Sequence, residues 1–73
     1  MKRLSELLAG ERGIIEDIEK GAKLRARLYD LGFVPGTEIL CAIKSPFGDP
    51  TAYFVRGTLI ALRCEDSQSI ILK

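Results

Sequence analysis

Two cysteines and a neighbouring pair of carboxylates are the residues of this chain that could hold a metal ion. Cys64 stands directly before Glu65 and Asp66, and these three are weak candidates for an Fe²⁺ or Zn²⁺ site. Such sites use imidazole, thiolate or clustered carboxylates, but the chain has no histidine, and Cys41 is far from Cys64 along the chain. Cys41 is expected to be a small buried hydrophobe. We therefore expect no metal site within one molecule and no cofactor, and leave open a weak divalent transition metal at Cys64 or a site shared between two molecules.

The same inventory argues against catalysis. Without histidine, the chain lacks the commonest general base, and neither a Ser–His nor a Cys–His nucleophile can be assembled. The glycines follow neither of the phosphate-binding patterns G-x-x-x-x-G-K-[ST] and G-x-G-x-x-G. We expect a protein that is not an enzyme and that binds no nucleotide by itself.

One group of side chains could bind a partner protein through charge. Lys23, Arg25 and Arg27 lie on a predicted helix, where cations can pair with an acidic surface. Most such groups are only a solvated helix face, here with Arg27 paired to Asp30 at i+3. We expect these three cations to contribute electrostatic docking and not catalysis.

A second group of side chains is apolar. Leu40, Ala42 and Phe54 occupy the outward positions of two predicted strands. If the hairpin between these strands turns near Phe47, Leu40 and Phe54 are cross-strand neighbours with Ala42 and Ala52 beside them. Exposed apolar patches usually mark contact surfaces; the alternative is burial under the helix or the N-terminal turn. We predict a partner-binding surface at Leu40, Ala42 and Phe54.

Length and composition limit the setting of these groups. The chain has 73 residues, 47% hydrophobic and 29% charged, which predicts one small folded domain over residues 1–73. Its net charge of +1 supplies little field for a nucleic acid, so none is expected as a partner. No stretch approaches the ~20 apolar residues of a membrane span. With only two cysteines, we expect a soluble, cytoplasmic protein without membrane insertion.

Alternation and turn signals predict a mainly β chain. A helical turn after Ser5 should end at Gly10, and one α-helix should cover 21–31, with an apolar stripe of Leu24, Leu28 and Leu31. Strands are predicted over 12–18, 39–44, 51–56, 59–62 and 70–72, and residues 64–69 are predicted to form a turn. The first strand needs a bulge to turn both Ile15 and Ile18 toward one core. In the second strand, Ile39, Cys41 and Ile43 are expected to face inward. Five short strands imply a small barrel.

Several motifs, in this order and spacing, resemble the ferrous iron transport protein A (FeoA) family. They are RLYDLGFVPGTEI at 27–39, SPFGDP at 45–50, VRG at 55–57 and ALR at 61–63, preceded by LSEL at 4–7 and GERG at 10–13. The resemblance covers about residues 4–72 and implies an SH3-like, five-stranded barrel with one inserted α-helix and a short N-terminal helical turn. Leu40 and Phe54 depart from the family, whose members tend to be polar there.

The resemblance also implies a function. Family members are cytosolic accessories of a membrane ferrous iron transporter that carries a GTPase domain, so this chain would be a non-enzymatic protein that binds and modulates that part of the transporter. Lys23, Arg25 and Arg27 would then face acidic regions or nucleotide phosphates of the partner. The alternative is a metal-sensing or regulatory module, because the same barrel forms the C-terminal domain of iron-dependent repressors. A weak homo-oligomer stays open.

Overall fold

The computed structural model describes residues 2–73, and most of its regular structure is β. Its helical segments are η1 (Leu4–Glu6), α1 (Arg25–Asp30) and α2 (Cys64–Ser67), and its strands are β1 (Arg12–Ile18), β2 (Glu38–Lys44), β3 (Thr51–Val55), β4 (Thr58–Leu62) and β5 (Ile70–Leu72). The predicted mainly β architecture with five strands is confirmed.

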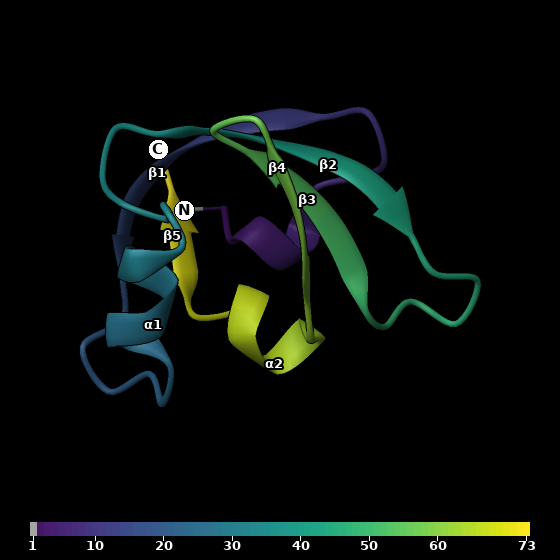
Figure 1. Ribbon diagram of the computed structural model, residues 1–73. Coiled ribbons are helices and arrows are strands. Elements are labelled where there is room, and N and C mark those ends of the chain that lie inside the picture. The colour runs from purple at the N-terminus through teal and green to yellow at the C-terminus, as the bar shows by residue number, and fades with distance from the viewer. Residues whose placement is uncertain (1) are drawn as a thin grey trace.

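All five strands belong to one antiparallel sheet with the order β4-β3-β2-β1-β5, which curls into a barrel (Figure 1). β1 takes part in both halves of the barrel, since residues 12–14 pair with β2 and residues 15–18 pair with β5. The register shifts between Ile15 and Asp17. This is the predicted bulge, and because of it both Ile15 and Ile18 are buried.

Apolar side chains from all five strands, η1 and α1 pack into one core. Its members are Leu4, Leu7, Ile15, Ile18, Leu28, Phe33, Ile39, Cys41, Tyr53, Val55, Leu62, Ile70 and Leu72. Cys41 is fully buried, as predicted for a small hydrophobe, and this burial raises the pKa of its thiol. A buried neutral thiol of this kind is a packing residue rather than a ligand or nucleophile.

The α-helix is shorter than predicted. α1 begins at Arg25 instead of Gly21, and the N–H of Arg25 donates to the Ala22 carbonyl in a preceding turn. Glycine is a poor helix former, so the segment that begins at Gly21 forms turns, and the helix starts only with the turn in which Leu28 packs into the core. Of the predicted stripe only Leu28 is fully buried, while Leu24 is 38% exposed.

A second bulge, in β2, overturns the expectation that Ile43 faces the core. Cys41 pairs with Tyr53, but Ile43 pairs with Ala52, so Ala42 is an extra residue without a partner opposite. An extra residue exchanges the two faces of the strand beyond it. Ile43 is therefore 59% exposed.

Two short helical segments differ from the prediction in detail. An N-terminal helical turn exists, but it covers Leu4–Glu6 and ends there instead of at Gly10. The Glu6 carboxylate accepts a hydrogen bond of 2.8 Å from the Arg3 N–H and so fixes the entry to the turn. The segment expected as a simple turn over 64–69 contains the helix α2. Its Ser67 hydroxyl donates to the Cys64 carbonyl, which lets this side chain be buried.

Candidate partner-binding surface

One outer side of the sheet is apolar where β2, β3 and β4 run side by side. Leu40 is opposite Phe54, as expected, and Phe54 is opposite Leu59 on its other side. The three side chains form a row across three strands, with Phe54 44% and Leu59 53% exposed. Phe54 and Leu59 thus lie at the surface and not beneath the helix or the N-terminal turn, while Leu40 is half-buried.

A second row lies beside the first. Ile43 is opposite Ala52, and Ala52 is opposite Ala61. Strand alternation predicted that Ala42 would lie beside Ala52 on this side of the sheet. Because of the bulge, Ile43 takes that position at the surface, and Ala42 is half-buried without a partner opposite. We call the two rows together the apolar face; it consists of Leu40, Ile43, Ala52, Phe54, Leu59 and Ala61.

Charge borders the apolar face on the β1 side. Arg12 lies opposite Leu40 across the β1–β2 pair, and its guanidinium is 3.6 Å from the Glu38 carboxylate. This exposed pair contributes little to stability, and the two charges offset each other on the β1 side of the apolar face. An apolar centre with a polar border is the usual composition of a protein–protein contact.

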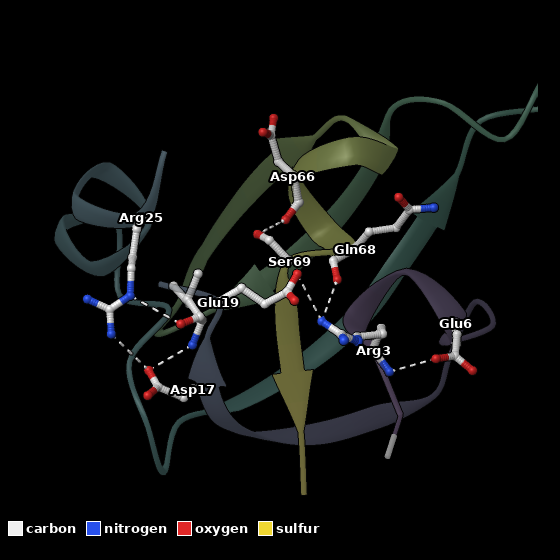
Figure 2. A network of polar contacts seen from close by, with 9 residues as sticks. Arg3, Glu6, Asp17, Glu19, Arg25, Asp66, Gln68 and Ser69 are labelled. Atoms are coloured by element: carbon white, nitrogen blue, oxygen red, sulfur yellow. Dashed lines mark hydrogen bonds and ion pairs between the residues drawn. The ribbon is translucent and has the colours of Figure 1, made fainter. Parts of the chain in front are cut away.

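Of the three cations on the predicted helix, Arg25 is occupied within the molecule. Its Nε donates to the Ile18 carbonyl at 3.1 Å, and its Nη2 lies 2.9 Å from the Tyr29 hydroxyl and 3.5 Å from Asp17 Oδ1. Figure 2 shows Arg25 pointing at Asp17 from α1. Arg25 therefore fastens α1 to β1, and a partner would have to compete for its donors.

The carboxylate at the centre of this contact gives a testable consequence. The Tyr29 hydroxyl, the Ile18 N–H and the Arg25 guanidinium hold the pKa of Asp17 below its ordinary value of 3.8. A lowered folded-state pKa gives stability that is present above the unfolded-state pKa and lost as the pH falls through the folded-state value. Asp17→Asn should thus lower the melting temperature at about pH 7, and the difference from wild type should disappear in acid.

Thermal unfolding followed from neutral pH into acid measures this difference. Asp30→Asn is the matched control, since Asp30 is exposed and makes no side-chain hydrogen bond or ion pair within residues 2–73. A melting temperature of Asp17→Asn equal to that of Asp30→Asn at neutral pH would contradict the role given to Asp17.

Lys23 and Arg27 are exposed. Arg27 and Asp30, both in the described part of the chain, form no ion pair, so the i+3 pairing of a simple solvated face is absent. Lys23 lines a pocket of about 420 Å³ between the segment before α1 and α2; the other lining residues are Ala22, Leu24, Arg63, Glu65, Asp66 and Ser69. Lys23 thus lines the same pocket as Glu65 and Asp66, two carboxylates that the sequence suggested only as metal ligands.

The weak metal candidates Cys64, Glu65 and Asp66 share α2. Within residues 2–73, no three cysteine, aspartate or glutamate side chains come together as a metal site requires. Cys64 is exposed, and its N–H donates to Asp49 Oδ1 at 2.9 Å. The geometry offers at most a single thiolate with carboxylates nearby, which is a weak ligand set.

Arg3 holds α2 in place, a role that sequence analysis missed. Its guanidinium donates to the Gln68 carbonyl at 3.2 Å and lies 3.1 Å from the Glu19 carboxylate, while the Ser69 hydroxyl donates to the Asp66 carbonyl at 2.6 Å (Figure 2). These contacts join the N-terminus, the end of β1 and α2. No local sequence signal reveals them, since the partners are far apart along the chain.

The fold and its surfaces define a small barrel of the SH3 type. FeoA from Stenotrophomonas maltophilia in complex with zinc, described as a procaryotic SH3 domain protein, matches with a TM-score of 0.88 at 28% identity, over 100% of this chain and 91% of that one. The solution structure of a FeoA protein from Chlorobium tepidum matches with a TM-score of 0.88 at 32% identity, over 97% of this chain and 68% of that one. A family model described as the FeoA domain matches residues 2–73, and the chain belongs to the FeoA family.

A curated relative and a structure that shares only the fold are both larger proteins. An Fe(2+) transport protein A/Fe(2+) transporter FeoB fusion protein of Porphyromonas gingivalis is 35% identical over 68 residues, which are 93% of this chain and 8% of the fusion protein. IdeR from T. acidophilum shares the fold alone, with a TM-score of 0.82 at 21% identity over 97% of this chain and 32% of that one. Between residues 2 and 73, no helix has the length and hydropathy to cross a membrane.

Proposed function

We propose that this chain acts as one domain, as a non-enzymatic cytosolic accessory of ferrous iron uptake that binds the GTPase-bearing cytosolic portion of a membrane Fe(II) transporter and modulates it. The fusion protein of Porphyromonas gingivalis carries this proposal, because it joins a related domain and a transporter in one polypeptide. Joining two modules raises their effective concentration for each other, which is useful when they act together.

The apolar face supports a docking role. Aromatic side chains are enriched in the apolar core of protein–protein interfaces, and here Phe54 lies between Leu40 and Leu59. The alanines of the second row leave room for partner side chains. Lys23 and Arg27, both exposed, add positive charge elsewhere on the surface, which speeds encounter with an acidic partner.

Capture of the transporter's GTPase-bearing cytosolic portion by the immobilised chain, with and without guanine nucleotide, tests the proposal. We expect saturable capture and an altered rate of GTP hydrolysis. A wild-type chain that captures none of this portion in either condition would overturn the proposed function.

Arg27→Glu tests the electrostatic part of the proposal. Reversing an exposed charge that lies outside the apolar face should slow association by roughly tenfold at low salt, and the effect should fade as salt screens the charge. Arg27→Lys is the matched control and should keep the wild-type rate. Equal association rates for Arg27→Glu and Arg27→Lys at low salt would show that the charge of Arg27 does not assist docking.

A metal-sensing or regulatory module is the second candidate function, favoured by the zinc bound to the Stenotrophomonas maltophilia protein. We propose instead that this chain has no resident cofactor and takes up Zn²⁺ or Fe²⁺ only weakly, through Cys64 with Glu65 and Asp66. Titration calorimetry of the reduced protein with Zn²⁺ should show no stoichiometric binding near the micromolar range, and Cys64→Ser should abolish any weak heat. One equivalent bound at micromolar affinity would favour the sensor.

A further inference from the structure

The outer edge of β4 is left without a partner strand. β4 ends the sheet on one side, and Figure 1 shows it in front, running from the turn after β3 down to α2. The other end of the sheet is covered by the chain itself, since the Leu72 N–H donates to the Lys2 carbonyl at 2.8 Å and Arg3 forms a β-bridge with Ile71. Within residues 2–73, only the β4 end of the sheet lacks such a cover.

The hairpin geometry decides which backbone groups face outward from β4. Residues 56–57 have φ of 49° and 80°, the signature of a two-residue type I′ turn, whose flanking residues Val55 and Thr58 exchange both hydrogen bonds. Antiparallel pairs alternate between bonded and non-bonded, so Leu59 and Ala61 direct their N–H and C=O groups away from β3. Neither residue makes another backbone hydrogen bond to the described chain.

β4 carries none of the features that protect an exposed edge. Natural edge strands are blunted by charges, prolines or bulges. The sequence Thr-Leu-Ile-Ala-Leu at 58–62 has no charge and no proline, and its pairing with β3 is regular throughout. An open, uncharged edge five residues long is a template for pairing with another polypeptide.

The side chains beside this edge indicate what would pair with it. Leu59 and Ala61 belong to the apolar face, and opposed residues of an antiparallel pair lie on the same side of a sheet. A strand added to β4 would therefore extend the apolar face by placing its own alternate side chains next to Leu59 and Ala61. The pocket lined by Lys23, Arg63 and Glu65 lies just beyond the end of β4, where such a strand would begin.

We infer that β4 receives an added strand from its partner: an extended, uncharged segment of the transporter's cytosolic portion, about five residues long and apolar at alternate positions. It pairs antiparallel to β4 through the N–H and C=O groups of Leu59 and Ala61, and a polar residue before it reaches the pocket. The inference rests on the proposed function, because it names how that partner is bound.

Ala61→Pro tests the inference through the backbone. The Ala61 N–H faces away from β3, so proline removes a donor from the free edge and leaves the β3–β4 ladder intact. Ala61→Val changes the side chain but keeps the N–H. Ala61→Val therefore measures the side-chain contribution alone. We expect Ala61→Pro to weaken capture of the transporter's cytosolic portion at least tenfold more than Ala61→Val does, with melting temperatures recorded for both.

Amide hydrogen exchange supplies a second measurement on the wild-type chain. The amides of Leu59 and Ala61 should exchange fast in the free protein and at least tenfold more slowly in the complex, while the Ile60 amide, bonded to β3, is slow in both. Slow exchange of Leu59 and Ala61 in the free protein, or equal capture by Ala61→Pro and Ala61→Val, would overturn the inference and leave the proposed function standing. If the free chain self-associates through these amides and Ala61→Pro abolishes only that, the occupant is a second copy and the inference is wrong.

Discussion

Phe33→Ala lowers the free energy of unfolding by about 3–5 kcal/mol, because it empties the space of a fully buried aromatic ring in the only core of the described chain. A chain of 73 residues has a total stability of roughly 4–11 kcal/mol. The substitution therefore removes a large part of that stability. Urea unfolding followed by circular dichroism measures it, and a loss below about 1 kcal/mol would contradict the central position of Phe33.

The chain contains its own control for this experiment. Phe47, at the tip of the β2–β3 loop, is 95% exposed, whereas Phe33 is 0% exposed. Phe47→Ala removes the same atoms from solvent instead of from the core, so it should change the free energy of unfolding by no more than about 0.5 kcal/mol. Equal losses for the two substitutions would contradict the burial of Phe33 and the exposure of Phe47.

Phe54→Asp weakens capture of the transporter's GTPase-bearing cytosolic portion by roughly thirtyfold or more, the effect of losing an aromatic hot spot and burying a charge in its place. Phe54 is 44% exposed, so folding depends on it far less than on Phe33. We expect the free energy of unfolding to fall by no more than about 1 kcal/mol, the range of strand propensity. Calorimetric titration and urea unfolding of the same preparation measure the two effects.

Phe47→Asp is the matched control for the binding measurement, since it introduces the same charge on an exposed phenylalanine that lies outside the apolar face. It should bind like wild type. A large loss of stability in Phe54→Asp with capture unchanged would instead make Phe54 a packing residue and end its role in docking.

The strands could be predicted because their signals are local. Turn residues and alternation define the five strands, and the uneven spacing of Ile15 and Ile18 indicated the bulge in β1. The bulge at Ala42 has no such signal, because residues 39–44 alternate as regularly as an unbulged strand and only the pairing with β3 shows the extra residue. The start of α1 at Arg25 likewise depends on contacts of its side chain with β1.

The candidate surface was predictable in part for the same reason. The cross-strand pairing of Leu40 with Phe54 could be predicted from strand alternation and from the symmetry of the hairpin. Leu59 joins them only through β4, and Lys23 and Glu65 line one pocket only because the fold brings the segment before α1 near α2. These contacts join distant parts of the chain, and no local pattern encodes them.

Backbone amide chemical shifts of the labelled chain, recorded while the transporter's GTPase-bearing cytosolic portion is added, test most directly whether this barrel docks through its apolar face. The account predicts the largest changes at Leu40, Phe54 and Leu59, and their loss in Phe54→Asp. Changes confined to β5 and η1, or no changes at all at saturating partner, would contradict it.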